Sequence, residues 1–143
     1  MGPRELASGI DTLIISLRGK LPEALASALA EAKGIALDLQ CPVGLTLGGV
    51  EWQLQPGRFG KYPYSLQHEY GSLGVTDSVA LPTMRWQPRA MYLHALGPAT
   101  IAYWLVDLAE REIGPVTTTV SRLDLHADFQ GLFYRPDAPA RSG

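Results

Sequence analysis

The sequence TTVSRLDLHADFQG, residues 118 to 131, alternates between polar and apolar side chains in the way typical of a β-strand. One face of such a strand carries mostly ionisable residues: Val120, Arg122, Asp124, His126 and Asp128. The other face carries mostly apolar residues: Ser121, Leu123, Leu125, Ala127 and Phe129. A shift of one residue would bury four ionisable groups. We therefore expect Leu123, Leu125 and Phe129 to pack on the core under a helix, and the ionisable row to lie on an open surface.

The segment before this strand, residues 97–115, has the pattern of an amphipathic helix. Pro98 suits the first helical turn, and Gly114 followed by Pro115 is a stop signal. The apolar positions share one face: Ile101, Ala102, Leu105, Leu108 and Ala109. This face predicts that the helix covers the sheet to which the following strand belongs.

The upstream sequence predicts a strand at 12–19, a helix at 21–34 that ends at Gly34, and a series of strands and hairpins between 35 and 93. Those strands are expected in IALDLQ (35–40), GLTLGGVEWQLQPG (44–57), YPYSLQHEYGSLGV (62–75) and PTMRWQPRAMYL (82–93). The order strand, helix, several strands, helix, strand favours the α+β class. We expect an antiparallel sheet with two main helices packed on one face.

The composition is that of a globular protein, with 46% hydrophobic and 18% charged residues. The length suits a single domain over residues 1–143, of which 135–143 are expected to form a loose tail. A formal net charge of -2 gives no general attraction to nucleic acid, so DNA binding would need a local basic patch. The single cysteine excludes an internal disulfide. Without a secretory signal or an apolar run of about 20 residues, we expect no membrane partner and a cytoplasmic location.

The ionisable row of residues 122–128 has the spacing of a metal site. Asp124 and His126 are two residues apart on one face, about 6.6 Å along a strand, so both can reach one cation. The same holds for His126 and Asp128, whereas Asp124 and Asp128 are roughly 13 Å apart in an extended strand. Arg122 could hold Asp124 or contact a phosphate. Carboxylate and imidazole ligands suit Mg or Mn, but a solvated outer face with ordinary ion pairs explains the same pattern.

The segment VSRLDLHADFQG, residues 120–131, resembles the Arg-[Leu/Ile/Val]-Asp-hydrophobic-x-x-Asp segment of the replication initiation factor family. These proteins are the rolling-circle initiators of phages, plasmids and mobile elements. The resemblance extends to GIDTLIISLRG (9–19), YPYSLQHEYGSLGV (62–75) and MRWQPRAMYLHALGP (84–98), followed by an amphipathic helix. It therefore covers most of the chain, although only the Arg-Leu-Asp strand is specific.

The resemblance implies an enzyme that nicks one DNA strand at a replication origin. A metal ion would polarise the scissile phosphate and a tyrosine would act as nucleophile. Carried over to this sequence, it implies that Arg122, Asp124 and Asp128 are catalytic. It also implies Mg or Mn as cofactor, with Asp124, His126 and Asp128 as ligands and Glu69 as a further acidic candidate from the upstream hairpin.

The sequence departs from the family at the nucleophile. The nicking tyrosine of such proteins lies well downstream of the Arg-Asp strand, in a Tyr-x-Gly-Ser-like stretch near an Arg-x-Tyr-Asp-Lys segment. This chain stops fifteen residues after Asp128 and has neither segment. Tyr103 and Tyr134 are candidate substitutes, but neither is favoured. We therefore expect a chain that resembles the first half of an initiator and does not nick origins alone, with a downstream half or a second copy as partner.

A second candidate surface lies between residues 52 and 92. Its basic side chains outnumber Glu69 and Asp77 by two; they are Arg58, Lys61, Arg85 and Arg89. Aromatic residues interleaved with basic ones can stack bases and follow phosphates, which predicts DNA binding. The alternative is that the aromatics are cross-strand pairs in the core. For the whole chain, the rival hypothesis is a non-enzymatic module, either a DNA-binding protein without metal or a structural or interaction domain.

Overall fold

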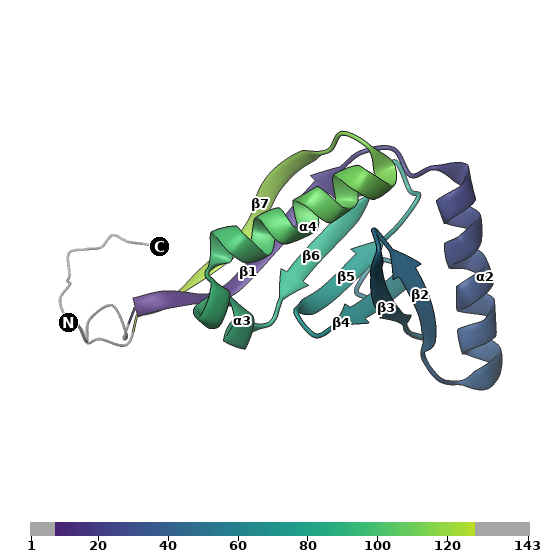
Figure 1. Ribbon diagram of the computed structural model, residues 1–143, viewed down its shortest axis with the longest axis horizontal. Helices are drawn as coiled ribbons and strands as arrows, with labels where there is room; N and C mark the ends of the chain where they lie inside the picture. The colour runs from purple at the N-terminus through teal and green to yellow at the C-terminus, as the bar shows by residue number, and fades with distance from the viewer. Residues whose placement is uncertain (1–7, 128–143) are drawn as a thin grey trace.

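The computed structural model describes residues 8–127, and the side chains of residues 12–124 within that range. The described residues form one antiparallel sheet and three helices (Figure 1). The strands are β1 (Ser8–Arg18), β2 (Val43–Leu47), β3 (Val50–Leu54), β4 (Tyr64–His68), β5 (Gly71–Val75), β6 (Met84–Pro88) and β7 (Thr117–Ala127). The helices are α2 (Glu23–Leu39), α3 (Ala90–Leu96) and α4 (Pro98–Ile113). The predicted α+β class is confirmed, while the expected tail at 135–143 lies outside the described residues.

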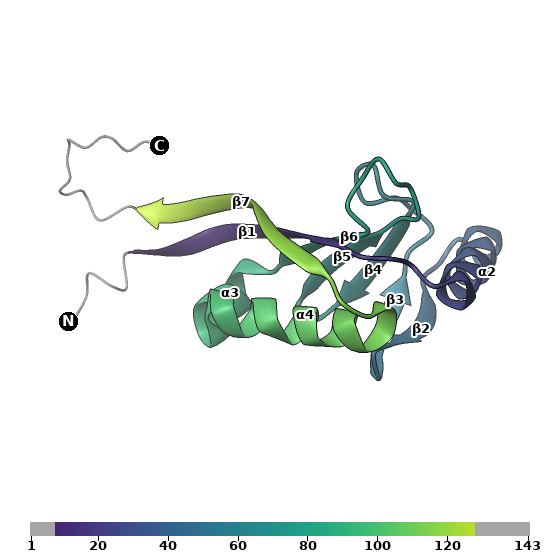
Figure 2. The same ribbon diagram turned by 90° about the horizontal axis from the view of Figure 1, so that it is seen from above.

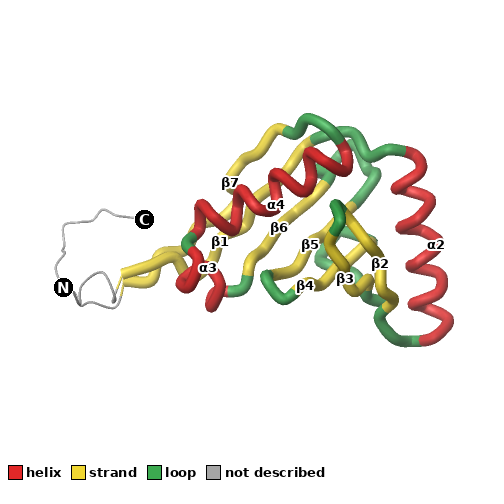
Figure 3. The backbone as a smooth tube through the Cα atoms, viewed as in Figure 1, coloured by secondary structure: helices red, strands yellow, loops and turns green. Residues whose placement is uncertain are grey.

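The strand order in the sheet is β2-β3-β4-β5-β6-β1-β7. Strands β2 to β6 follow one another in sequence, and β1 is inserted between β6 and β7. Helices α3 and α4 contact β1, and α2 contacts β2 and β3 at the other end of the sheet. Figure 3 shows this arrangement, with α4 lying roughly along the direction of β1 and α2 standing beside the β2–β3 hairpin. The helices thus cover one face of the sheet, as predicted.

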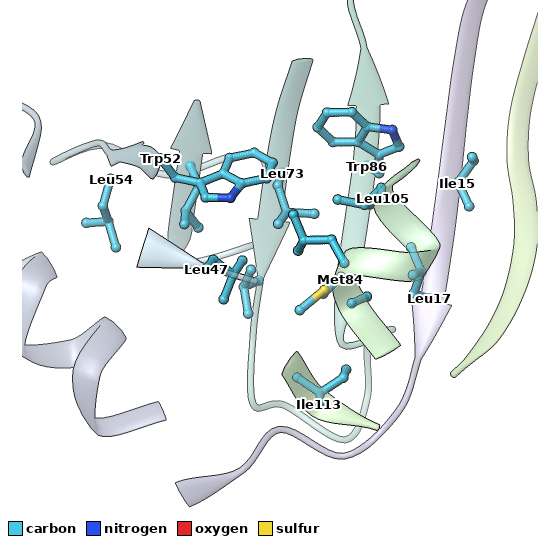
Figure 4. Close-up of a cluster of buried hydrophobic side chains, with 14 of the residues drawn as sticks. Ile15, Leu17, Leu47, Trp52, Leu54, Leu73, Met84, Trp86, Leu105 and Ile113 are labelled. Atoms are coloured by element: carbon cyan, nitrogen blue, oxygen red, sulfur yellow. The ribbon is translucent and has the colours of Figure 1, made fainter. Parts of the chain in front are cut away.

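The hydrophobic core lies between the helices and the sheet. Side chains from nearly every element meet there, and Figure 4 shows the central ones: Ile15, Leu17, Leu47, Trp52, Leu54, Leu73, Met84, Trp86, Leu105 and Ile113. Trp52 and Trp86 are fully buried, with ring centroids 5.9 Å apart in an edge-to-face arrangement. Burial of these two large rings contributes much of the apolar stabilisation of a domain this small.

Helix α4 is confirmed with its predicted start, stop and apolar face. Pro98 lies in the first turn and Gly114 ends the helix. Ile101, Leu105 and Leu108 are fully buried. A helix with one apolar stripe and a nearby sheet has only one favourable way to bury that stripe, which is why the sequence pattern sufficed.

The β2–β3 hairpin is also confirmed, and its tight turn docks on α4. Gly48 and Gly49 both have positive φ, 61° and 78°, as a two-residue hairpin turn requires. A Cβ atom on Gly48 would lie 2.4 Å from Cγ of Leu108, so only glycine fits there. The backbone N–H of Gly48 also donates to Glu112 Oε2 at 2.8 Å. Both contacts fix this end of the sheet to α4.

Helix α2 is longer than predicted, because it continues through Gly34 to Leu39 and replaces the strand expected at 35–40. A Cβ atom on Gly34 would meet nothing within 4 Å, so this glycine breaks no contact and costs the helix only about 1 kcal/mol. Ala36 continues the buried stripe of Leu29 and Ala32 and is itself fully buried. Tertiary packing therefore outweighs the local stop signal, and the helix ends at Gln40 in the left-handed conformation, with φ 58°.

The strand predicted over 82–93 is wrong in its second half, which forms α3. Pro88 has no N–H to donate to a sheet, so β6 ends there. Arg89 is extended, with φ -75° and ψ 142°, and its N–H donates to the carbonyl of Tyr70 at 2.8 Å. The next residues are helix formers, and Leu93 is buried beneath the helix.

The burial predicted for β7 is wrong at Leu123, which is 49% exposed. Two features of the sheet explain the error. First, β7 is the outermost strand, and α3 and α4 lie over β1. Second, Ile14 pairs with Arg122 and Ile15 with Val120, so Ser121 is the extra residue of a β-bulge. The bulge interrupts the alternation, so Val120 lies on the helix side together with Leu123, not with Arg122. Of the other two predictions, the side chain of Leu125 and all of Phe129 lie outside the described residues.

Strands β1 and β7 extend beyond the rest of the sheet. β1 pairs with β6 only over Ile15–Leu17 but with β7 from Ser8 to Arg18. The first half of β1 and the second half of β7 therefore form a two-stranded ribbon. Figure 2 shows this ribbon reaching past α3, away from the body of the molecule.

Candidate nucleic-acid interface

The sheet face turned away from the helices, here called the open face, carries a row of polar side chains. In β1, Leu13, Ile15 and Leu17 point into the core, so Ser16 points to the open face. Register then assigns polar residues of the neighbouring strands to the same face: Gln53, Gln67, Ser72, Arg85, Gln87, Arg122 and Asp124. Two of the predicted site regions, the upstream basic residues and the β7 row, therefore share one face of the sheet.

The loop of residues 55–63 lies over one end of the open face. A Cβ atom on Gly74 would lie 2.7 Å from Phe59 and 2.9 Å from Tyr62, so the loop is in close contact with β5. Phe59 and Tyr62 also exchange two backbone hydrogen bonds, of 3.0 and 2.9 Å. The guanidinium of Arg85, on β6, lies over the Phe59 ring at 5.9 Å from its centroid.

Helix α2 also contacts this loop, through the side chain of Lys33. The Lys33 ammonium donates to the carbonyls of Gly57 and Pro63, both at 2.8 Å. Burial lowers the pKa of Lys33, and the positive charge of Arg58 lowers it further. Arg58 itself donates to the Lys61 carbonyl at 3.0 Å. The loop backbone is thus held by one cation of α2, Lys33, and by one of its own, Arg58.

Five cations gather around this loop; they are called the basic cluster and are Arg18, Lys33, Arg58, Lys61 and Arg85. Burial raises the pKa of Tyr62, and the charges of Arg85 and Arg18 oppose that rise. Arg18 is two residues beyond Ser16 on β1, and Ser16 pairs with Arg85, so the two arginines lie on the same face of neighbouring strands. Arg18 also lines a cavity of about 310 Å³ together with Lys20, Asp77 and Thr83. Asp77 raises the pKa of nearby Tyr64, though less than burial does, and supplies negative charge beside the cluster.

Arg89 lies apart from the other three predicted DNA-binding residues. It follows the end of β6, four residues from Arg85 and so about 13 Å along the strand. There it lines a second cavity, of about 380 Å³, with Glu51, Gln53, Gln67, His68 and Glu69. The structure therefore brings Arg58, Lys61 and Arg85 together and places Arg89 beside Glu69.

Two residues of this second cavity, Glu69 and His68, are engaged with neighbouring side chains and backbone. The Tyr92 hydroxyl donates to Glu69 Oε2 at 2.9 Å, and this hydrogen bond raises the pKa of Tyr92. The Tyr70 N–H donates to His68 Nδ1 at 3.0 Å. Burial lowers the pKa of His68, with Glu69 opposing and Arg89 adding to the effect. His68 packs between Trp52, Tyr70 and Trp104 at centroid distances of 4.9 to 5.2 Å. Glu69 is therefore engaged with a phenol, and His68 is packed among aromatic rings.

Most aromatics of the predicted DNA-binding window belong to the core. Trp52 is fully buried in the core, and Tyr64 and Tyr70 pack against it, which supports the alternative of core pairing for these three. Tyr62 is 3% exposed, but it is buried against β5 on the open face. Phe59 is partly exposed in the basic loop and is the ring nearest Arg85. Basic charge, not aromatic stacking, is thus the main property of this surface.

On β7, Arg122 is bound to Asp124. Its Nε and Nη2 both donate to Oδ2 of Asp124, at 3.0 and 2.9 Å. The two side chains are 63% and 44% exposed. This ion pair is one of the two roles predicted for Arg122. It occupies one carboxylate oxygen of Asp124, which is also a predicted metal ligand.

The described residues do not assemble the predicted metal site. Glu69 follows β4, and β5, β6 and β1 separate that strand from β7, a distance of about 19 Å at the usual strand spacing. Glu69 therefore cannot share an ion with Asp124. Within residues 12–124, no three His, Cys, Asp or Glu side chains lie close enough together to hold a metal. The His126 side chain and all of Asp128 lie outside the described residues, as does Tyr134.

Tyr103, the other candidate nucleophile, is 72% exposed on α4. That helix lies on the covered face of the sheet, whereas Arg122 and Asp124 are on the open face. The sheet therefore separates this phenol from the predicted catalytic row.

Sequence analysis missed Arg18, Lys33 and His68. Strand alternation puts Arg18 on the same face of β1 as Ser16, so the sequence did contain a signal for Arg18. Lys33 gave no such signal, because its partners lie 24 and 30 residues away.

No helix in the described range is long and apolar enough to cross a membrane. Comparisons of the chain with protein-family models, curated proteins and solved structures find no match.

Proposed function

We propose that the chain binds DNA through the basic cluster, as a replication-initiator-like module. The observation that carries the proposal is the convergence of five cations from β1, α2, the 55–63 loop and β6 around one loop of the open face. Cations placed near one another without equal negative charge suit a polyanionic ligand, and phosphate groups spaced along a backbone provide one.

The rigidity of the loop supports the proposal. Lys33 fixes the loop backbone at Gly57 and Pro63, and Phe59 packs between β5 and Arg85. A preorganised basic surface loses little conformational entropy when it binds, so more of the electrostatic attraction contributes to affinity. Because the whole chain carries a net charge of -2, the attraction has to be local and strongly dependent on salt.

The proposal covers DNA binding and not strand cleavage. A site for Mg or Mn would have to combine Asp124 with His126 and Asp128, since Glu69 is four strand spacings away. Asp124 would also have to give up part of its pairing with Arg122. The described residues alone do not fit such an ion, so no catalytic step is assigned to them.

The test is fluorescence anisotropy with labelled single-stranded and duplex DNA. If the cluster contacts about four phosphates, the affinity should fall roughly a hundredfold between about 50 and about 200 mM salt. Substituting Arg58→Gln together with Lys61→Gln should weaken binding on all sequences and reduce the salt slope by about two. Arg111→Gln is the control, because Arg111 lies on the exposed side of α4 in a surface pair with Asp107. Equal loss in both variants, or no binding at low salt, would favour the rival interaction-domain hypothesis.

A further inference from the structure

We propose that β7 pairs with β7 of a second copy of this chain, antiparallel and about a two-fold axis at Leu123. The sheets of two copies would then form one continuous sheet. This inference rests on the edge of the sheet and is independent of the DNA-binding proposal.

The first observation is that β7 has a free edge. It is the last strand in the sheet order, and among the described residues it pairs with β1 alone. Its outward N–H and C=O groups are therefore available to another strand. The bulge at Ser121 distorts the first half of β7, but every β7 residue from Arg122 to Ala127 has a partner on β1. The second irregularity of this pairing, between Ile10 and Thr12, adds its extra residue to β1, so β7 itself is continuous from Arg122 to Ala127 and can add a strand.

The second observation is that this half is complementary to itself in charge. With Leu123 opposite Leu123 of the second copy, Arg122 lies opposite Asp124 and Asp124 opposite Arg122. Both new ion pairs are on the open face, where the two side chains already meet within one chain. An axis at Arg122 would place two arginines opposite each other, and an axis at Asp124 two aspartates. Like charges directly opposite are unfavourable, so charge selects the register centred on Leu123.

The third observation is an uncovered apolar side chain at the same position. Leu123 is 49% exposed on the helix side of β7, the outermost strand of the sheet. In the proposed register the two Leu123 side chains are direct cross-strand neighbours, with Cβ atoms about 5 Å apart, and each shields the other from water. One residue thus supplies apolar contact on one face while its two neighbours supply ion pairs on the other.

The shape of the molecule leaves this edge accessible. The ribbon of β1 and β7 extends past α3 in two perpendicular views (Figure 1, Figure 2). Since β7 is the outer strand of the ribbon, no described helix stands between it and a second copy.

The test is a charge swap followed by sedimentation analysis of the intact chain. The wild type should sediment at twice the 15.5 kDa of one chain. Asp124→Arg and Arg122→Asp should each abolish the dimer, because each places like charges opposite one another. The double variant Arg122→Asp with Asp124→Arg should restore it, since both pairs are reversed but remain complementary. A monomeric wild type, or single variants that stay dimeric, would overturn the proposal. Circular dichroism melting curves establish that each variant is folded.

A cross-linking experiment tests the register separately. In a Cys41→Ser background, Leu123→Cys should give a disulfide-linked dimer on mild oxidation, because the two Cβ atoms face each other across the axis. Thr118→Cys, on the same exposed edge but far from the axis, is the matched control. Equal cross-linking at both positions would refute the proposed register. So would cross-linking at position 118 alone.

Discussion

β1 and β7 are paired from Ser8 to Arg18, yet one is buried and the other exposed. Every β1 residue from Leu13 to Leu17 is at most 7% exposed. Every β7 residue from Thr117 to Leu123 is exposed, including Val120 at 60% and Leu123 at 49%. The local patterns differ, because β1 is almost entirely apolar over Leu13–Leu17, whereas β7 alternates between polar and apolar residues. Position adds to this difference, because β1 has a strand on each side and helices above it.

The comparison teaches that alternation predicts a strand and its two faces, but not how deeply either face is buried. Burial depends on which strands become neighbours, and β7 reaches its only described neighbour across more than a hundred residues of chain. Substitutions in the buried strand and in the exposed one test this contrast.

Leucine truncation should show the contrast most strongly. Leu17→Ala removes a fully buried side chain from the core and should lower the free energy of unfolding by about 2–5 kcal/mol. Leu123→Ala should cost less than about 1 kcal/mol, because half of that side chain is already in water. Urea unfolding followed by tryptophan fluorescence measures both, at a protein concentration low enough to exclude association. Comparable losses would mean that β7 is covered in solution and that the contrast is wrong.

The hydroxyl pair that links the two strands should have an intermediate effect. Ser16 is 7% exposed and shares a hydrogen bond with Ser121 across the bulge. Ser121→Ala should cost about 1 kcal/mol, since it leaves a buried hydroxyl without its partner. The double variant with Ser16→Ala should cost no more than the single one, because both ends of the bond are then removed. Strict additivity in this cycle would show that the hydroxyls do not interact.

The surface ion pair on β7 should have the smallest effect. Asp124→Asn should reduce stability by at most about 1 kcal/mol at low salt, and by less at high salt, because both side chains are largely solvated. Asp107→Asn breaks the comparable exposed pair with Arg111 on α4 and is the control. A much larger loss at Asp124 in the monomer would mean that Arg122 depends on this carboxylate inside a buried network.

The sequence predicted those parts of the fold that local chemistry determines. The amphipathic stripe and the Pro98 and Gly114 signals predicted α4, and the β2–β3 hairpin lies within the stretch 44–57 where strands were expected. Prediction failed where tertiary contacts outweighed local signals. Gly34 does not end α2, because Ala36 adds to the buried side of that helix. The bulge at Ser121 has no local signature, since it arises from the pairing with β1.

The candidate site was predictable to a similar extent. Arg58, Lys61 and Arg85 were selected from charge counting within one window, and the structure groups them. Arg89 was predicted together with them, but the structure places it apart. It lies four residues after Arg85, about 13 Å away, just beyond the other end of β6. Lys33 comes from a helix whose contact with the loop only the fold creates. For Glu69 and Asp124, the strand order decides that they are far apart, and no spacing in the sequence reveals it.

The central position of β1 also has a consequence for how the chain folds. β1 is synthesised before both of its neighbours in the sheet, β6 and β7. The hydrogen bond of Ser16 can form only after Ser121 has been made, 105 residues later. Until then the segment LIISL has β-branched and apolar side chains, no charge and no proline, the features of a sequence prone to intermolecular pairing. Closing so long a loop is slow, because its entropy is lost before the contacts form. We therefore expect synthesis of this protein to need protection of β1, by a chaperone or by early collapse onto the β2–β6 meander, until β7 is made.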